Sequence, residues 1–273
     1  MTRRKLLFSF FGSTLVYPCY VEPRWLDLTR RTVRLQTPVG HPIRILHLSD
    51  FHASLLVPLS MIDHAITAGL SAKPDLICLT GDFITHREDF DAGEYAATLR
   101  RLSAAAPTFA VLGNHDGGEW ASRHLGNYDH RAVDRILEEA GIELLHNRSV
   151  MPEVRGHRIQ LAGVGDLWSD EIDADRAFRN VRSGRPTVLL AHNPDSKDEL
   201  RRQPWDLMLS GHTHGGQIII GFDGSRYAPV EDKRYVAGLK SWGTRQIHVT
   251  RGVGNIAGVR FRCRPEASVL AVV

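Results

Sequence analysis

Hydrophobic and polar residues occur in blocks along this chain. From residue 43 onward, short apolar runs end abruptly in polar residues. Runs rich in Ile, Leu and Val that are bounded by Gly, Pro or Asp are typical of buried strands. The pattern therefore predicts strands over residues 43–48, 76–79, 109–112, 188–191 and 207–209.

Helical patterns fill the intervals between the first three predicted strands. Residues 59–70 and 95–102 place apolar side chains at helical spacing. Strand–helix–strand units of this kind form parallel sheets, so the pattern indicates the α/β class. Nothing in the pattern divides residues 43–273, which we expect to form one catalytic domain. Further strands are predicted over 142–145, 158–164, 217–220, 247–250 and 268–273, and loops over 117–135 and 222–243.

Residue types that bind metals follow each of the first five predicted strands. Sheets of this class bind ligands outside the carboxyl ends of their strands, so we expect the five ends to converge. Taken singly, each polar end is equally well explained as a loop cap or a turn. Taken together and in order, they favour a metal site. The residues are Asp50, His52, Asp82, Asn114, His115, His192, His212 and His214.

This donor set fits two divalent ions. Imidazole suits Zn, Fe, Mn and Ni, and carboxylate and amide oxygens suit harder ions. Four His, two Asp and one Asn suffice for two metals and leave His115 over. Two ions ~3.5 to 4 Å apart bind both the attacking and the leaving oxygen of a displacement at phosphorus, and they lower the pKa of bound water towards ~7. Two carboxylates offset half of the charge of two divalent ions, which favours an anionic phosphate ester as substrate.

Composition narrows the choice of function. The 273 residues are 42% hydrophobic and 24% charged, which excludes a disordered chain and a polytopic membrane protein. The net charge is +3, too small for a phosphate-tracking surface, so we expect no nucleic-acid partner and disfavour a nuclease. The three cysteines are widely spaced without a CxxC motif, so neither a disulfide framework nor a thiolate zinc site is expected.

Residues 1–21 are predicted to be a membrane-anchoring or twin-arginine-like targeting segment. Arg3, Arg4 and Lys5 precede an apolar run over 6–17 that is shorter than the ~18 to 20 residues of a spanning helix. Basic residues continue in a predicted connector over 22–42, and basic flanks on both sides suit a segment that lies on an anionic membrane. A terminus without a membrane role is the alternative. We expect a membrane-associated bacterial protein, either on the cytoplasmic face or exported.

The polar ends follow one another as Asp50-x-His52, Gly81-Asp82, Gly113-Asn114-His115-Asp116, His192 and Gly211-His212-x-His214. This order resembles that of the calcineurin-like metallophosphoesterase superfamily. Residues 22–25, 191–197, 204–208, 211–217, 228–239 and 250–254 further resemble the bacterial YaeI-type phosphodiesterases. Their wider group includes the twin-arginine-exported YkuE type and the UDP-2,3-diacylglucosamine hydrolases of lipid A biosynthesis. The resemblance covers nearly the whole chain, and it implies a four-layer α/β/β/α sandwich with two mixed β-sheets.

The resemblance also implies a role for each polar residue. Asp50, His52 and His214 would hold the first metal, Asn114, His192 and His212 the second, and Asp82 would bridge them. His115 would be the catalytic general acid, or a donor to the leaving oxygen in the transition state. Mn is the implied activating ion, with Zn and Fe as alternatives. Many members carry a carboxylate three residues after the bridging Asp to orient the catalytic His, whereas this chain has Thr85, so the orientation of His115 stays open.

Together these observations predict a dinuclear phosphodiesterase or pyrophosphatase in which a metal-bridging hydroxide attacks phosphorus. Because an anchoring segment accompanies the site, the favoured substrate is an amphiphilic phosphoester such as UDP-2,3-diacylglucosamine, a nucleotide-linked lipid. The alternatives are an exported phosphodiesterase of broad specificity and a non-catalytic membrane-bound binding protein on the same fold. Arg251 is a candidate for contacting phosphate, or else a solvated hairpin residue. Asp116 is expected either to support the site or to cap a turn.

Overall fold

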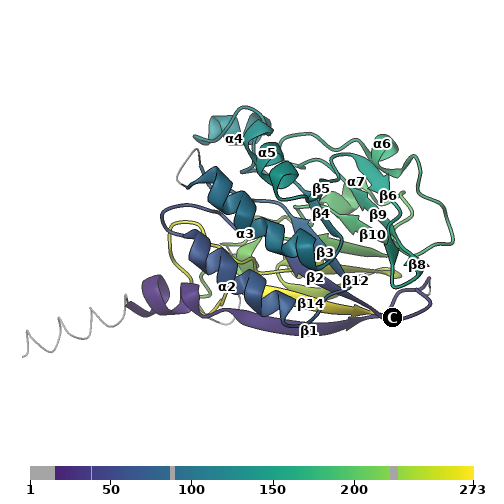
Figure 1. The fold of residues 1–273 in the computed structure, drawn as a ribbon, viewed down its shortest axis with the longest axis horizontal. Coiled ribbons are helices and arrows are strands. Elements are labelled where there is room, and N and C mark those ends of the chain that lie inside the picture. Colours follow the sequence, from purple (N-terminus) through teal and green to yellow (C-terminus); the bar gives the residue numbers. More distant parts are fainter. Residues whose placement is uncertain (1–15, 38, 87–89, 222–226) are drawn as a thin grey trace, which may run out of the picture.

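Two six-stranded β-sheets pack against each other at the centre of the molecule, and helices cover their outer faces (Figure 1). The computed structural model describes residues 16–37, 39–86, 90–221 and 227–273. Both sheets contain parallel and antiparallel pairs. The mixed α/β fold with two large mixed sheets confirms the predicted fold class.

The first sheet has the strand order β1-β14-β2-β3-β4-β5. Strands β2, β3, β4 and β5 are parallel neighbours, β14 is antiparallel to β2, and β1 is parallel to β14 at the edge. The carboxyl ends of β2, β3 and β4 therefore meet at one edge of the sheet. The strands are β1 (Asp27–Val33), β2 (Ile43–Leu48), β3 (Leu76–Thr80), β4 (Thr108–Val111), β5 (Glu143–Leu144) and β14 (Glu266–Val272).

The second sheet has the order β12-β13-β11-β10-β9-β6. Its four middle strands are parallel, and the two outer strands run antiparallel to them. The strands are β6 (Arg148–Val150), β9 (Gln160–Gly163), β10 (Thr187–Leu190), β11 (Leu207–Ser210), β12 (Gly238–Trp242) and β13 (Arg245–Val249). A separate ribbon pairs β7 (Glu153–Val154) with β8 (His157–Arg158).

Helices flank the two sheets on opposite sides. Helices α2, α3 and α5 lie over the first sheet, and α6 and α7 lie by the second (Figure 1). Asp91 caps α3 by accepting a hydrogen bond from the backbone N–H of Glu94 at 2.8 Å. The helices are α2 (Leu59–Leu70), α3 (Ala92–Ala105), α4 (Gly118–Arg123), α5 (Arg131–Glu139), α6 (Ala174–Phe178) and α7 (Ser196–Glu199), and the short helical turns are η1 (Tyr17–Val21), η2 (Glu22–Arg24), η3 (His214–Gly216) and η5 (Lys233–Tyr235).

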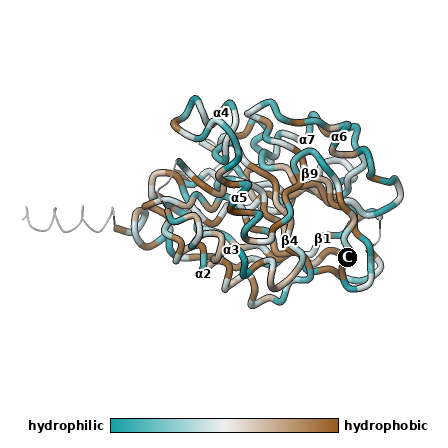
Figure 2. The backbone as a smooth tube through the Cα atoms, turned by 45° about the horizontal axis from the view of Figure 1, so that its top comes forward, coloured by the Kyte–Doolittle hydropathy of each residue, from teal (hydrophilic) through white to brown (hydrophobic). Residues whose placement is uncertain are grey.

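The alternation of side chains along the strands explains the layers. On β2, Leu46 and Leu48 pack into the cluster beneath the helices, whereas Ile43 and Ile45 pack into the cluster between the sheets. Each such side chain contributes about 1.5 to 3 kcal/mol when it is fully buried. Figure 2 shows the hydrophobic strand segments gathered in the interior, with more hydrophilic loops around them. A strand apolar on both faces therefore lies between two layers.

Four segments differ from the sequence prediction. Residues 27–33, predicted as part of a connector, form the edge strand β1, whose polar composition suits a strand with one neighbour. Residues 217–220 form no strand, because Gln217 has a φ of 53° and Ile218 makes an isolated bridge with Phe261. The predicted loop 117–135 contains α4 and the start of α5, and the predicted loop 222–243 contains η5 and the edge strand β12.

The predicted targeting segment falls mostly outside the described residues, which begin at residue 16. Its remaining part, η1, lies against the loop around residue 260: the backbone N–H of Arg260 donates to the carbonyl of Pro18 at 2.8 Å, and the rings of Tyr17 and Phe261 meet edge to face. Within the described ranges, no helix is both long enough and apolar enough to cross a membrane.

Candidate metal centre

The carboxyl ends of five strands meet between the two sheets and bring six of the seven candidate ligands into two groups of neighbouring ligand atoms. Each candidate follows β2, β3, β4, β10 or β11 within four residues of the strand end. Each is buried, with an exposed fraction of 4% or less. The candidates are Asp50, His52, Asp82, Asn114, His192, His212 and His214.

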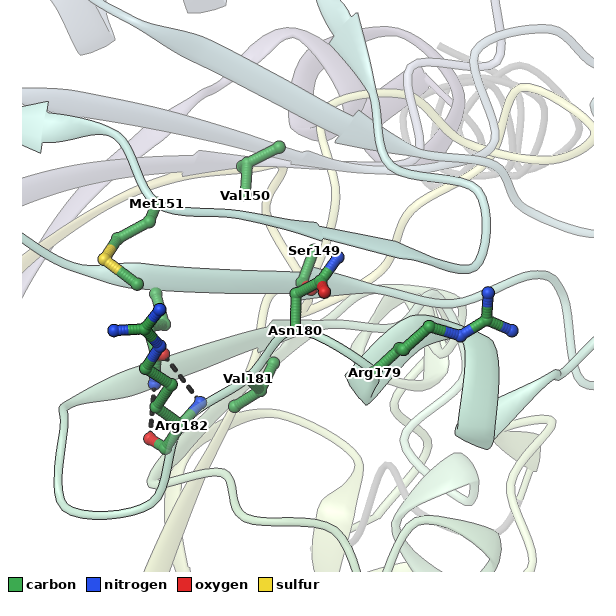
Figure 3. Close-up of a pocket in the computed structure, with 8 residues that line it drawn as sticks. Ser149, Val150, Met151, Arg179, Asn180, Val181 and Arg182 are labelled. Atoms are coloured by element: carbon green, nitrogen blue, oxygen red, sulfur yellow. Dashed lines mark hydrogen bonds between the residues drawn. The ribbon is translucent and has the colours of Figure 1, made fainter.

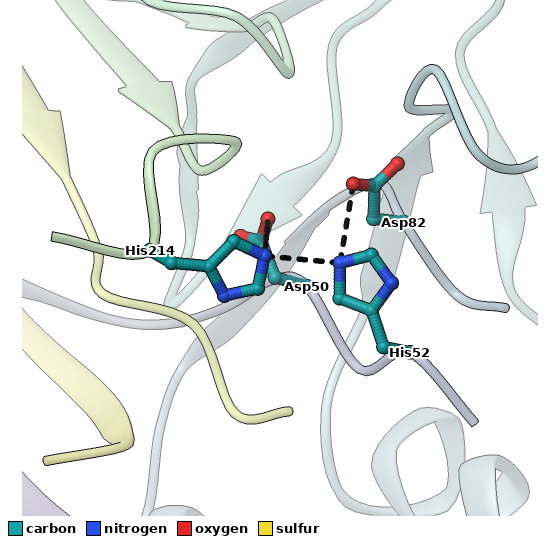
Figure 4. A group of neighbouring side chains, drawn as sticks. All are labelled: Asp50, His52, Asp82 and His214. Atoms are coloured by element: carbon teal, nitrogen blue, oxygen red, sulfur yellow. Dashed lines mark hydrogen bonds and ion pairs between the residues drawn. The ribbon is translucent and has the colours of Figure 1, made fainter. Parts of the chain in front are cut away.

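Four of these side chains form the first ligand group, with ligand atoms within 4.8 Å of one another (Figure 4). The Nε2 atoms of His52 and His214 face each other at 3.0 Å. The His52 Nε2 lies 3.3 Å from Oδ2 of Asp82, and the His214 Nε2 lies 3.5 Å from Oδ1 of Asp50. Two imidazoles and two carboxylates therefore point at one place.

Asp82, His192 and His212 form the second ligand group. The Nδ1–H of His192 donates to the carbonyl of Thr80 at 2.6 Å, which directs its Nε2 towards the other two side chains. That Nε2 lies 3.2 Å from Oδ2 of Asp82 and 3.2 Å from Nδ1 of His212. Asp82 therefore belongs to both groups, as a bridging ligand must.

Asn114 supports the fit of this donor set to metal ions. Its Oδ1 is buried, and within the described part of the chain it has no hydrogen-bond partner. A buried oxygen without a partner is unfavourable, and a cation would satisfy it. The imidazoles, carboxylates and this amide oxygen together are able to hold two borderline divalent ions.

The electrostatics of the centre also favour cations. Burial disfavours a charged His192, but the carboxylates of Asp82 and Asp50 outweigh it and raise the pKa of His192 to about 10. Burial likewise opposes ionisation of Asp82, but the facing His192 and His115 hold the pKa of this carboxyl well below its ordinary value. The cavity therefore attracts positive charge.

Five of the seven candidates have left-handed backbone conformations, which are uncommon for residues other than glycine. Such conformations cost of order 1 to 3 kcal/mol each and cluster at functional sites. Two glycines leave room for the carboxylates: a Cβ on Gly211 would clash with Asp50 and Ser49, and one on Gly113 would clash with Asp82. The left-handed residues are Asp50, His52, Asp82, His212 and His214, with φ between 48° and 67°.

Comparison with known proteins identifies the family. The family model of the calcineurin-like phosphoesterases matches residues 43–216, which include every candidate ligand. The chain belongs to the calcineurin-like phosphoesterase family. The resemblance predicted from the motifs is thereby confirmed.

Three relatives of this phosphoesterase extend the comparison over its whole length. Phosphodiesterase YaeI of Escherichia coli is 42% identical, over 94% of this chain and 92% of the relative. The uncharacterized metallophosphoesterase YkuE of Bacillus subtilis is 29% identical, over 100% of this chain and 98% of the relative. UDP-2,3-diacylglucosamine pyrophosphatase LpxG of Chlamydia muridarum is 26% identical, over 97% of this chain and 98% of the relative.

A solved structure has the same fold. The 5'-nucleotidase precursor of Thermus thermophilus superposes with a TM-score of 0.50 at 12% identity. The match covers 84% of this phosphoesterase and 55% of the nucleotidase chain, so the two share a fold over about half of the larger protein.

His115 of the phosphoesterase lies beside both ligand groups and is held by the backbone. Its Nδ1–H donates to the carbonyl oxygen of Thr85 at 3.3 Å, and its backbone N–H donates to Oδ1 of Asp82 at 3.0 Å. A main-chain carbonyl thus orients His115 where related enzymes are expected to use a carboxylate. Burial lowers the pKa of His115 to about 4. Its Nε2 is the ring nitrogen left for substrate.

Asp116 connects the loops of β3 and β4. Its carboxylate accepts from the backbone N–H groups of Gly113 and Asp82 at 2.8 Å and of Phe83 at 2.6 Å. Burial, together with the charge of Asp82, raises the pKa of Asp116 to about 7. Asp116 therefore caps the turn that begins at Gly113 and also holds Asp82 in place, so both roles considered for it apply.

Three further residues lie near the centre, and two of them, Asp166 and Trp120, were absent from the sequence prediction. Asp166 is buried beyond β9, has an unpartnered Oδ1 among the described residues, and has its pKa raised by burial to about 6. Gly165-Asp166 follows a predicted strand in the same way as Gly81-Asp82 does, so the sequence pattern contained a signal for Asp166. Trp120 meets the ring of His115 edge to face at 4.8 Å, and Trp168 meets that of His212 at 4.2 Å.

Arg251 is held by structural ion pairs. Its Nε donates to Glu266 at 3.1 Å, and its NH2 group donates to Asp27 at 2.8 Å. These contacts tie β1 and β14 together and favour a structural role over a phosphate contact.

A separate pocket of about 430 Å³ lies beside β6, lined by Met151, Asn180 and their neighbours, and none of the candidate ligands lines it (Figure 3).

Proposed function

We propose that this phosphoesterase is a dinuclear-metal-dependent phosphodiesterase or pyrophosphatase that cleaves an amphiphilic phosphoester. The observation that carries the proposal is the sharing of Asp82 by two ligand groups. YaeI is named a phosphodiesterase and LpxG a UDP-2,3-diacylglucosamine pyrophosphatase, so both names agree with phosphoester cleavage. We propose Mn as the activating ion, with Zn and Fe as alternatives.

The protein residues would bind two metal ions as follows. When bound, two divalent ions would lower the pKa of water and take up charge on the phosphate. Asp50, His52 and His214 would hold one ion, Asn114, His192 and His212 the other, and Asp82 both.

His115 would pass a proton from Nε2 to the leaving oxygen. A histidine with a lowered pKa is a strong acid once it is protonated, and an approaching phosphate anion favours its protonation. Because Thr85 accepts from Nδ1, the ring would keep Nε2 directed away from the backbone.

Two tryptophans support a substrate with an apolar or planar part. Trp120 and Trp168 lie 5.5 Å apart, each against a histidine of the centre, and Trp168 is 40% exposed. Aromatic rings offer large apolar contact area and stack on planar groups. They would form one wall of the substrate site.

Exposed apolar residues support an association with a membrane surface. Tyr20 and Trp25 of the amino-terminal part are 65% and 51% exposed. Leu55 and Leu56, which follow His52 closely, are 81% and 55% exposed. A membrane-bound lipid phosphoester such as UDP-2,3-diacylglucosamine would then be reached on the cytoplasmic face. Export of the chain would exclude this substrate and favour a broad-specificity phosphodiesterase.

A comparison of matched substrates tests the proposal. We expect the Mn-loaded full chain to cleave UDP-2,3-diacylglucosamine at least about tenfold more efficiently than the same UDP-sugar without acyl chains. Burial of two methylene groups, at about 0.8 kcal/mol each, is sufficient for that factor. Equal cleavage of the two would contradict the lipid substrate. Cleavage of neither, with turnover of a chromogenic diester, would contradict the lipid and leave the reaction class standing.

A further inference from the structure

A third group of metal-binding residues lies apart from the ligands of the phosphoesterase centre. His130, His146 and Glu171 place one ligand atom each within 4.8 Å of one another. The Nε2 of His130 lies 2.9 and 3.1 Å from the two carboxylate oxygens of Glu171, and the rings of His130 and His146 are 5.7 Å apart. His130 precedes α5, His146 lies between β5 and β6, and Glu171 lies between β9 and α6. Three distant segments thus converge on one point.

The surroundings of this cluster are negatively charged and incompletely paired. Asp134 lies one turn beyond His130 on α5, and its charge acts on both histidines. Among the described residues, Oδ1 of Asp134 and Nδ1 of His130 are buried without a hydrogen-bond partner. All of these residues are partly buried, so water can reach the cluster. Metal binding requires both imidazoles to be neutral, and the two carboxylates beside them then carry a negative charge that a cation would offset.

We propose that His130, His146 and Glu171 bind one Zn²⁺ ion, independently of the dinuclear centre. Two imidazoles and one carboxylate are an established donor set for zinc, and water completes a four-coordinate site. Asp134 would add charge beside the ion, or hydrogen-bond the water.

The site would fix the segment that carries Trp120. Gly117 and Gly118 follow Asp116, have φ values of 149° and 85°, and lead into α4. A Cβ on Gly117 would lie 2.8 Å from Nδ1 of His130, and one on Gly118 would lie 2.6 Å from Oε1 of Glu171. The backbone that enters α4 therefore packs directly on the cluster.

Trp120 of α4 touches the catalytic candidate His115, and Trp168 lies three residues before Glu171. An ion held by His130 and Glu171 would connect the two segments that carry these tryptophans. The zinc would thus be structural, and its effect on the active site would be to hold the aromatic wall in place.

Zinc content after equilibrium dialysis tests the site. The metal-stripped full chain should take up one zinc ion more than His146→Ala and than the isosteric Glu171→Gln. His64→Ala, which removes a histidine of α2, is the control and should bind as much zinc as the natural sequence. Equal zinc content in the natural sequence and in both cluster variants would overturn the proposal and leave His130 and Glu171 as an ion pair.

A second variant separates this proposal from the proposed function. Asp82→Ala removes the bridging ligand of the dinuclear centre and should still take up the zinc of the cluster. In Asp82→Ala, zinc should slow amide hydrogen exchange in residues 117–123, and it should not do so when His146→Ala is added. Exchange that zinc leaves unchanged in Asp82→Ala would overturn the structural role, whatever the outcome for catalysis.

Discussion

Asp82 connects the two ligand groups with each other and with His115. Its carboxylate faces His52 at 3.3 Å and His192 at 3.2 Å, and it accepts the backbone N–H of His115 at 3.0 Å. The pKa of Asp82 stays well below its ordinary value because the charges around it outweigh burial. One ionised side chain thus lies at the centre of the proposed chemistry.

Replacement of Asp82 tests the bridging role. Asp82→Ala should abolish hydrolysis of a chromogenic phosphodiester and remove both ions of the dinuclear centre, because each ion loses a ligand and the cavity loses negative charge. Activity and Mn content are measured on the same preparation. Retained turnover, or retained Mn at both positions, would show that Asp82 does not bridge.

Replacement of His115 separates catalysis from metal binding. His115→Ala should lower the rate about 10²- to 10⁴-fold while both ions stay bound, since general acids contribute factors of that size. Thr85→Ser is the matched control: it keeps the backbone carbonyl that accepts from His115 and the hydroxyl that donates to the His52 carbonyl, so its rate should stay within about twofold of the natural sequence. An unchanged rate in His115→Ala would remove this residue from the mechanism.

At the scale of elements, a pair of histidines joins the two sheets. His47 of β2 and His248 of β13 are completely buried, with their Nδ1 atoms 3.0 Å apart, and His47 Nε2 lies 2.9 Å from the hydroxyl of Thr80. Burial lowers the pKa of His47 well below its ordinary value and that of His248 to about 4. Both rings are therefore neutral in the folded protein.

This pair should make stability depend on pH. Below about pH 6.5 the unfolded chain protonates both histidines while the folded chain does not, so stability is complete above pH 6.5 and is lost as the pH falls towards 4. Each histidine should contribute a slope of about 1 kcal/mol per pH unit. His248→Gln should show a smaller loss than the natural sequence when metal-stripped protein is unfolded in urea at pH 7.5, 6 and 5. Identical losses would show that His248 is charged or exposed in the folded state.

The sequence predicts a strand correctly where successive side chains along it are buried and apolar. Strands such as β2 and β3 are apolar on both faces because they lie between two layers, and polar ligands follow them where the layers end. The edge strand β1 has the sequence of an exposed segment, since its one neighbour is the carboxyl-terminal strand β14, far away along the chain.

The ligands could be predicted because they follow apolar strands. The residues that hold or surround them could not be predicted. Asp50 and Asp82 each follow the end of a strand after one intervening residue, so local sequence places them at the site. The contact of Trp120 with Trp168, and the use of the Thr85 carbonyl for His115, depend on loops that meet only in three dimensions.

On the scale of the whole molecule, each of the two sheets supplies part of the metal centre. β2, β3 and β4 supply Asp50, His52, Asp82 and Asn114, and β10 and β11 supply the remaining three histidines. Packing of the sheets therefore assembles the site, and the family match covers all of these positions.

The amino-terminal part should determine whether the molecule binds membranes. The full chain should co-sediment with vesicles that contain anionic lipid, and a variant without residues 1–15 should co-sediment less, because it loses Arg3, Arg4, Lys5 and most of the apolar run but keeps the exposed Tyr20 and Trp25. The shortened variant should still cleave the chromogenic diester. Equal sedimentation of both forms would show that another surface binds the membrane or that none is specific.

The most direct test of the dinuclear phosphoesterase is metal reconstitution. Metal-stripped protein is mixed with Mn, Zn, Mg or no metal, and hydrolysis of a chromogenic phosphodiester is measured beside that of a phosphomonoester. We predict no turnover without metal and restored diester cleavage with Mn, because the seven ligands fit two such ions. Diester cleavage that is equally fast without metal, or no turnover of any phosphoester by protein that has bound two ions, would contradict this account.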